Sequence, residues 1–154
     1  RLYYFSQTYS QPLWWDEADY MDMARAWSGS NVIWLESSVR PILLPFLAFL
    51  FMFLGLGETS IRFLIMLSSI ASILLLYGIG NLFFNKRIAL ISSFILAIFW
   101  SFTFYSYRIL TDVPLIMLWL ATIYFFFNAY FKEKTWKSYI LPGIFLGLSF
   151  LIFL

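Results

Sequence analysis

Four stretches of the chain carry no charged residue, and each is close in length to a helix that crosses a lipid bilayer. They cover residues 63–85, 88–107, 113–131 and 138–154. A helix needs about 20 mostly apolar residues to cross roughly 30 Å of hydrocarbon. The pattern therefore predicts an all-α, polytopic membrane protein with transmembrane helices at about 61–81, 88–107, 113–131 and 138–154.

A fifth apolar stretch, residues 41–57, is shorter and is bounded by residues that break helices. Pro41 and Pro45 stand at its start, and Gly55 and Gly57 stand at its end. Its continuous apolar part would rise about 22 Å as a helix at roughly 1.5 Å per residue, which is less than a bilayer. We therefore expect a helix at 41–57 that lies in the membrane interface or re-enters the bilayer, instead of crossing it.

An acidic, aromatic stretch ahead of it predicts an amphipathic helix at about 16–28. Asp16 is suited to the N-cap position, Glu17 and Asp19 suit the positive end of the helix, and Ser28-Gly29 can end it. One face of this helix is apolar and is formed by Tyr20, Met23, Ala24 and Trp27. A helix of this kind lies in the membrane interface, which would place its acidic start at the depth of the lipid headgroups.

Positive charge in the short connections predicts the orientation in the membrane. Lys86 and Arg87 stand in one connection, and Lys132, Lys134 and Lys137 stand in another. The positive-inside rule places both connections in the cytoplasm. If 41–57 does not cross, residues 1–60 form an external first loop and 61–154 form the transmembrane part. Asp112 then shares the extracytoplasmic (or lumenal) face with the acidic helix.

The amino-acid composition excludes several classes of protein and of functional site. The chain is 62% hydrophobic and 12% charged, whereas soluble domains are about 45–50% apolar and about 25% charged. The net charge of +2 is too small to indicate nucleic acid as a partner. With no Cys and no His, the chain cannot form a disulfide framework, a thiol nucleophile, a Ser-His relay or a His/Cys zinc site. Carboxylates, guanidinium groups, hydroxyls and backbone remain.

Four charged side chains near the predicted external face are candidates for function: Asp16, Arg40, Arg108 and Asp112. Ionisable residues at the edge of a membrane domain are often functional. The alternative interpretation is that the two acids only cap helices. Asp16 can be a helix cap, and Thr111-Asp112-Val113-Pro114 reads as a helix start in which Asp112 is the cap and Pro114 lies in the first turn.

The order of several motifs resembles the N-terminal part of a known enzyme superfamily. The motifs are Trp15-Asp16-Glu17-Ala18 with Tyr20 and Ala24, Arg40-Pro41-Ile42-Leu43-Leu44-Pro45 with Gly55, Arg62, Asn85-Lys86-Arg87, and Arg108-Ile109-Leu110-Thr111-Asp112-Val113-Pro114-Leu115. They are similar to those of GT-C glycosyltransferases that use polyprenyl-phosphate sugars, within the group of the dolichyl-phosphate-mannose-protein mannosyltransferases and aminoarabinose transferases. The resemblance covers nearly the whole chain.

This resemblance implies an external loop with membrane-parallel helices and a site made of carboxylates and arginines. It implies that Asp16-Glu17 supplies the catalytic carboxylate, that Asp112 is the second external acid, and that Arg40 meets the donor phosphate. Arg108 is a further candidate for the phosphate. The chain departs from the aminoarabinose branch, which has Glu-Lys-Pro-Pro where this chain has Val39-Arg40-Pro41-Ile42. No cofactor is firmly implied; a divalent cation (Mg²⁺ or Mn²⁺) stays open, and the lack of an Asp-x-Asp pattern at Asp112 argues against a tightly held metal.

The function expected from this resemblance is an inverting membrane glycosyltransferase. Its partners would be a polyprenyl-phosphate sugar donor, a protein, lipid or glycan acceptor, and the lipid bilayer, with no nucleic acid. Asp16 would accept the proton of the acceptor hydroxyl, while Glu17 or Asp112 would orient the acceptor. A transporter or flippase fragment and a structural subunit remain as alternatives. The chain starts at Arg1 and stops inside an apolar run, so we expect an N-terminal fragment that is inactive alone.

Overall fold

A computed structural model describes residues 1–30, 40–133 and 135–153. Val39 and Lys134, which the sequence interpretation uses, lie outside the described residues. The described chain is helical and contains no strand, which confirms the all-α prediction. Its elements are α1 (Leu2–Thr8), α2 (Trp15–Trp27), α3 (Leu43–Phe53), α4 (Glu58–Phe83), α5 (Lys86–Ile98), α6 (Trp100–Tyr105), α7 (Asp112–Asn128), a π-helical turn (Ala129–Glu133), a 3-10 turn (Trp136–Tyr139) and α8 (Ile140–Phe153).

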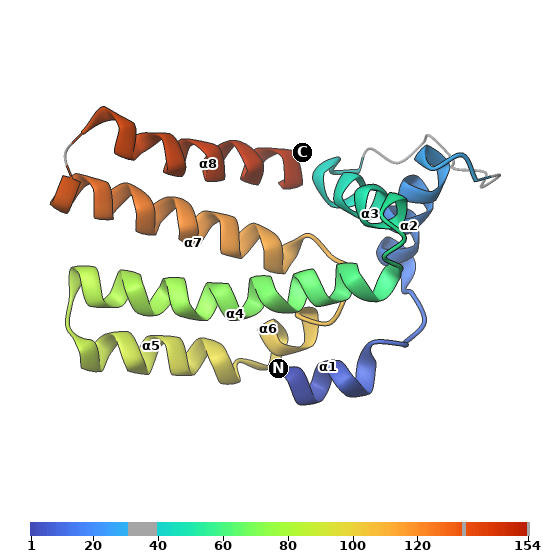
Figure 1. The fold of residues 1–154 in the computed structure, drawn as a ribbon. Coiled ribbons are helices and arrows are strands. Elements are labelled where there is room, and N and C mark those ends of the chain that lie inside the picture. Colours follow the sequence, from blue (N-terminus) through green and yellow to red (C-terminus); the bar gives the residue numbers. More distant parts are fainter. Residues whose placement is uncertain (31–39, 134, 154) are drawn as a thin grey trace.

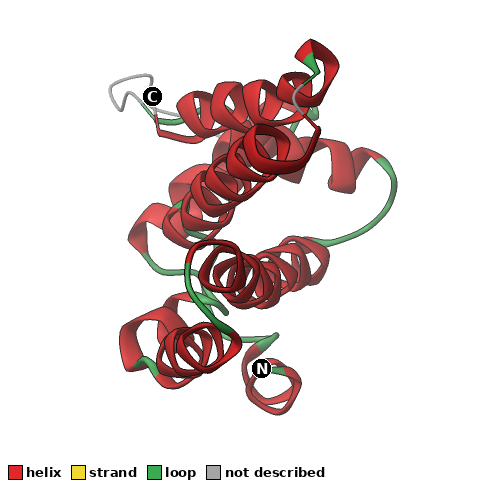
Figure 2. Cartoon of the chain, turned by 90° about the vertical axis from the view of Figure 1, so that its left-hand side faces the viewer, coloured by secondary structure: helices red, strands yellow, loops and turns green. Residues whose placement is uncertain are grey.

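The long helices lie side by side, and the short helices gather at one end of them (Figure 1). α4 packs against both α5 and α7, and α7 packs against α8. The α4–α5 and α7–α8 connections lie at one end of this bundle, and α2 and α3 lie at the opposite end. Figure 2, turned by 90°, shows the long helices nearly end-on.

Three helical stretches of the described chain are long and apolar enough to cross a membrane: Glu58–Phe83, Asp112–Lys132 and Trp136–Phe153. They correspond to three of the four predicted spans. By the length and composition of these helices, the chain is an integral membrane protein.

The structure differs from the predicted continuous helix over 88–107. α5 ends at Ile98, Phe99 is extended with φ −62° and ψ 117°, and α6 begins at Trp100. No proline or glycine marks this break. The break turns α6 so that Phe102 is buried in the core and the Phe104 ring lies 5.6 Å from the Trp14 ring in a tilted contact. Tertiary packing thus overrides the helical preference of the apolar run.

α2 and α3 are each followed by a glycine in the left-handed conformation. α2 ends at Trp27, one residue before its predicted end at 28, and α3 ends at Phe53, four residues before its predicted end at 57. Gly55 follows α3 with φ +75°, its N–H donates to Met52 O at 3.0 Å, and Leu56 N–H donates to Phe51 O at 2.8 Å. Gly29 ends α2 in the same way with φ +84°. This Schellman geometry suits glycine because it carries no Cβ. α3 rises only about 16 Å at roughly 1.5 Å per residue, and it packs against α2 at the bundle end.

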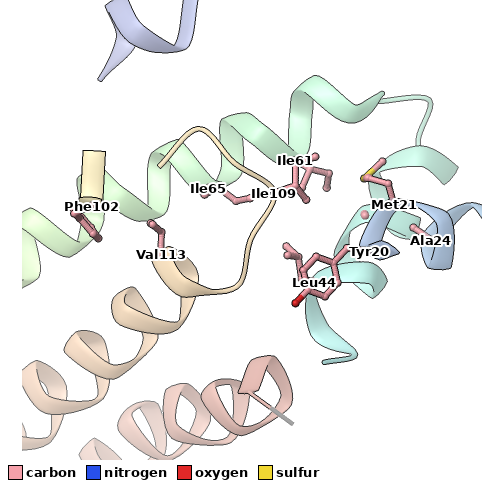
Figure 3. Packing of buried hydrophobic residues seen from close by; sticks show 10 residues of the cluster. Tyr20, Met21, Ala24, Leu44, Ile61, Ile65, Phe102, Ile109 and Val113 are labelled. Atoms are coloured by element: carbon pink, nitrogen blue, oxygen red, sulfur yellow. The ribbon is translucent and has the colours of Figure 1, made fainter. Parts of the chain in front are cut away.

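The buried hydrophobic core lies at this end of the molecule. α2 contributes Tyr20, Met21 and Ala24, α3 contributes Leu44, α4 contributes Ile61 and Ile65, and the α6–α7 connection contributes Ile109 (Figure 3). Much of the surface of the long helices is exposed and apolar, as suits a lipid environment. The core therefore fixes α2 and the α6–α7 connection, which carry the candidate site.

Candidate active site

The start of α2 separates the two adjacent acids of the Asp16-Glu17 pair. The helix begins at Trp15, and Trp14 occupies the N-cap position with an extended backbone. Glu17 accepts a hydrogen bond from Trp14 N–H at 2.7 Å, so it serves as the capping acid of the first turn. The prediction that Asp16 is the N-cap is therefore wrong by two positions, because the helix already begins at Trp15. The Asp16 side chain is 52% exposed and is not used for capping.

Arg40 reaches from just before α3 to the acids of α2. Its Nη2 lies 2.8 Å from Asp16 Oδ1 and 2.6 Å from Asp19 Oδ2. The hydrogen bond to Asp19, and then that to Asp16, raise the pKa of the Arg40 guanidinium above its usual value. The Arg40 Nε is buried and has no hydrogen-bond partner among the described residues. The predicted phosphate ligand and the predicted base are thus in direct contact.

Tyr20 brings Asp112 into this group. Burial raises the pKa of the Tyr20 phenol, a hydrogen bond with Thr111 and the charge of Arg40 oppose that rise, and the charges of Asp16 and Asp112 add to it. The Tyr20 phenol of α2 thus lies beside Thr111, the residue that precedes Asp112 at the start of α7. Asp112 is exposed as the first residue of α7, whose N-cap position is taken by Thr111. Asp112 is therefore not the N-cap of α7, contrary to the capping interpretation, while Pro114 lies in the first turn as predicted.

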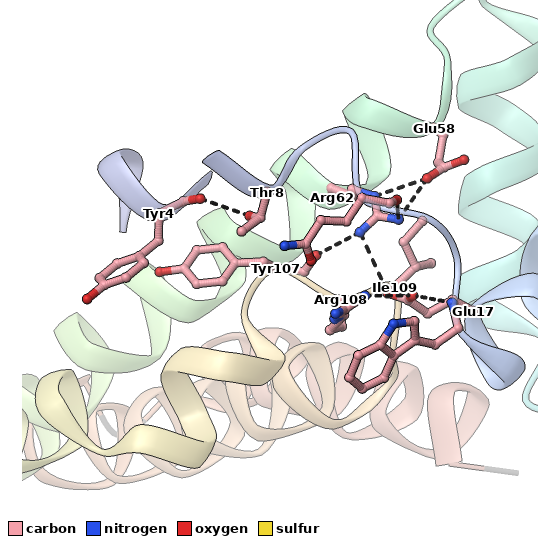
Figure 4. Close-up of polar contacts among 10 residues, drawn as sticks. Tyr4, Thr8, Glu17, Glu58, Arg62, Tyr107, Arg108 and Ile109 are labelled. Carbon is pink, nitrogen blue, oxygen red and sulfur yellow. Dashed lines mark hydrogen bonds and ion pairs between the residues drawn. The ribbon is translucent and has the colours of Figure 1, made fainter. Parts of the chain in front are cut away.

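Glu17 is fully buried and joins α2 to the α6–α7 connection. Its Oε1 accepts from Ile109 N–H at 2.6 Å, and its Oε2 accepts from Trp14 N–H (Figure 4). Arg108 Nη1 lies 3.5 Å from Oε2, and Arg62 Nη1 lies 3.8 Å from Oε1. Glu17 has no exposed surface, and both of its carboxylate oxygens accept hydrogen bonds from the protein backbone. The expected role of Glu17 in orienting the acceptor stays a prediction.

Arg62 is the second centre of this buried network. It donates from Nε and Nη2 to Glu58 Oε1, at 3.0 and 2.8 Å. It also donates from Nη1 to Tyr107 O at 3.1 Å and from Nη2 to Gln11 O at 3.0 Å. The guanidinium thereby joins α4, the α6–α7 connection and the segment before α2. Two acids and two arginines give the network no net charge, and burial of such charges requires this pairing.

Arg108 lies in the buried network instead of on the open surface. Its guanidinium stands 3.7 Å from the centre of the Trp14 ring and 5.5 Å from that of Phe104. The five predicted site residues thus lie at one end of the molecule in two layers. Asp16, Arg40 and Asp112 form the accessible layer, and Glu17 and Arg108 form the buried one.

Sequence reasoning missed Arg62 as a site residue. The signal available was its position at the start of a transmembrane helix, four residues after Glu58, which is the spacing of a helical ion pair. Its contacts to Gln11 and Tyr107 come from distant parts of the chain, and no local pattern predicts them. Within the described residues, no three acidic side chains come close enough together to hold a metal ion.

Comparison of the sequence with models of protein families identifies one match. A family model described as "Dolichyl-phosphate-mannose-protein mannosyltransferase" matches residues 39–152, which is most of the chain. The matched range contains Arg40, Arg62, Arg108 and Asp112, and it begins after Asp16 and Glu17. A search of curated proteins and a search of solved structures found no match.

Proposed function

Because the chain belongs to the dolichyl-phosphate-mannose-protein mannosyltransferase family of GT-C-type membrane glycosyltransferases, we propose that it takes part in sugar transfer from a polyprenyl-phosphate donor to an acceptor hydroxyl. The transfer takes place at the extracytoplasmic (or lumenal) end of the bundle, where α2 and α3 lie. The contact of Arg40 with Asp16 supports this proposal most directly, because it joins an anion-binding group to an exposed carboxylate.

The proposed reaction is a single displacement at the anomeric carbon. The acceptor oxygen attacks this carbon, the bond from the carbon to the phosphate oxygen breaks, and polyprenyl phosphate leaves. Asp16 accepts the proton of the acceptor hydroxyl as the new bond forms. Such a displacement inverts the anomeric centre and needs no protein nucleophile, which agrees with the carboxylate and guanidinium chemistry available in this chain.

Arg40 is the proposed ligand of the donor phosphate. A guanidinium binds phosphate oxygens through two parallel N–H donors, and Arg40 has a donor at Nε that is not used by another described residue. Binding the phosphate draws Arg40 from the Asp16 oxygen, which frees that oxygen for the acceptor hydroxyl. The Arg40 guanidinium then meets the negative charge that develops on the phosphate.

Asp112, Glu17 and Arg108 have supporting roles in this proposal. Asp112 is exposed near Tyr20 and is positioned to stabilise positive charge on the sugar in the transition state. Glu17 and Arg108 are positioning residues, since both are buried. They hold the first turn of α2 against the α6–α7 connection, and so they hold Asp16 relative to Asp112.

The experiment is a comparison of two substitutions in α2 of the full-length protein in lipid nanodiscs. Asp16→Asn should reduce transfer from a polyprenyl-phosphate sugar by about 10²-fold or more, the usual scale for loss of a general base. Asp22→Asn is the matched control, because Asp22 is an acid of the same helix that pairs with Arg25 at 2.8 Å. Transfer close to the wild-type rate in Asp16→Asn would exclude Asp16 as the base.

A further inference from the structure

A pocket lies beside Asp16 that none of the roles above uses. Its volume is about 580 Å³, and it is lined by Pro12, Leu13, Trp14, Trp15, Asp16 and Leu110. Asp16 is the only lining residue with a charged side chain; the others are apolar or aromatic. The pocket therefore offers one carboxylate at the edge of an apolar surface. This combination is typical of a small-molecule site, in which apolar walls surround a few polar groups.

The buried Glu17 holds both walls of this pocket. Its two carboxylate oxygens accept from Trp14 N–H on one wall and from Ile109 N–H, next to Leu110, on the other. The Trp14 ring is fixed as well, with the Arg108 guanidinium 3.7 Å from its centre and the Phe104 ring centre 5.6 Å away. The Trp14 and Leu110 walls of the pocket are thus held in place, which reduces the entropic cost of binding a ligand.

Trp15 differs from Trp14 in that its side chain has no such support. It is 91% exposed and makes no ring contact with another described aromatic residue. An indole that only anchors a protein in the membrane interface has no need of a carboxylate beside it. Here the indole and the Asp16 carboxylate are consecutive in the first turn of α2 and line the same pocket.

We propose that this pocket is the acceptor subsite of the transferase and that it takes a pyranose ring. This inference rests on the function proposed above. A pyranose has an apolar C–H face, which packs on an indole ring, and an edge of hydroxyl groups, which donate to a carboxylate. Asp16 thereby receives the acceptor hydroxyl from the pocket. Arg40 contacts Asp16 but does not line the pocket, so the donor phosphate has a separate position.

Three of the six lining residues offer no free backbone donor to a ligand. Pro12 has no N–H, Trp14 N–H donates to Glu17, and Leu110 N–H donates to Arg108 O at 2.9 Å. Side chains therefore define most of the ligand surface, and the exposed Trp15 indole beside the Asp16 carboxylate matches the C–H face and the hydroxyl edge of a pyranose. The acceptor that we assign to this subsite is a glycan that ends in a pyranose.

The first test measures binding without any donor. Methyl pyranosides of the gluco, galacto and manno series are titrated against the full-length protein in nanodiscs, and binding is followed by saturation-transfer NMR. Trp15→Ala should weaken the binding of at least one glycoside by about tenfold, and Trp15→Phe should keep most of it. Trp136→Ala is the matched control, because Trp136 is 74% exposed and lies near the α7–α8 connection at the other end of the bundle.

The second test measures transfer. With a glycan acceptor, Trp15→Ala should raise the acceptor KM about tenfold and leave the donor KM unchanged. The proposal is overturned if wild-type protein binds none of the glycosides, if Trp15→Ala binds them like wild type, or if a short serine peptide displaces them and is the better acceptor. A failure of glycoside binding with transfer still lost in Asp16→Asn overturns the subsite alone. Transfer that survives in Asp16→Asn overturns the proposed function, whatever the glycosides do.

Discussion

Asp16 and Glu17 are neighbours in the sequence, and the start of α2 gives them opposite environments. Since the helix begins at Trp15, Glu17 falls at the third helical position, from which it reaches back to Trp14 N–H. Asp16 then points away with its carboxylate free for Arg40. Sequence alone predicts that this acidic pair begins a helix. It does not predict which acid is buried, because that depends on Ile109, Arg62 and Arg108 from distant parts of the chain.

Glu17→Ala should destabilise the fold strongly. It leaves Trp14 N–H and Ile109 N–H without their acceptor and removes the negative partner of two buried arginines. Loss of one member of a buried ion pair costs about 3–5 kcal/mol. Thermal unfolding in a fixed detergent measures this, with Asp22→Ala as the control. The exposed Asp22–Arg25 pair should contribute less than about 1 kcal/mol, and equal losses in the two variants would contradict the buried network.

Arg62→Lys should also destabilise, although it keeps the charge. A lysine ammonium cannot replace a planar guanidinium that donates to Glu58, Tyr107 O and Gln11 O at once. Each buried acceptor left without its partner costs about 1–3 kcal/mol. The same unfolding measurement detects this loss. Arg25→Lys, at an exposed site, should unfold like wild type; if Arg62→Lys does so too, the contacts of Arg62 carry no stability.

Arg40→Gln tests the donor side of the site. If Arg40 binds the donor phosphate, the donor KM should rise by about tenfold or more while the acceptor KM changes little, because a charge-assisted contact to phosphate is lost. Steady-state transfer kinetics with the donor and acceptor varied separately measure both values. Arg25→Gln is the control, since Arg25 pairs with Asp22 and not with Asp16. An unchanged donor KM would remove Arg40 from the phosphate site.

At the scale of the helices, the approach of α4 to α5 depends on a glycine. A Cβ added at Gly80 would lie 2.7 Å from the Ala89 Cα, which is backbone and cannot rotate away. Gly80→Ala should therefore destabilise by about 1–3 kcal/mol, the usual cost of overpacking. Gly147→Ala in α8 is the control, because a Cβ there meets nothing within 4 Å, and its greater helix propensity should add up to about 1 kcal/mol. Equal effects on the unfolding temperature would contradict the close packing of α4 and α5.

Those helices whose sequence signals lie in adjacent residues could be predicted. Charge-free length predicts α4, α7 and α8, and the glycines after α2 and α3 predict their ends, since both signals reside in adjacent residues. The break at Phe99 could not be predicted. It arises from the burial of Phe102 and the contact of Phe104 with Trp14, which join residues far apart in the sequence.

For the whole molecule, the described lysines gather at one end of the bundle. Lys86 and Arg87 begin α5 directly after the α4–α5 connection, Lys132 and Lys137 lie in the turns between α7 and α8, and the opposite end carries α2 and α3. The positive-inside rule then predicts that α2 faces the extracytoplasmic side.

The absence of cysteine allows this orientation to be tested, because single cysteines can be introduced without removing any thiol of this chain. Asp22→Cys should react with a membrane-impermeant maleimide in intact cells or sealed vesicles, whereas Lys86→Cys should react only after permeabilisation. The two positions lie at opposite ends of the helical bundle, so labelling of both from the same side would mean that α4 does not cross the bilayer. Labelling of Lys86→Cys alone in sealed cells or vesicles would show the reverse orientation, with Asp16 on the cytoplasmic side, which contradicts transfer on the extracytoplasmic side.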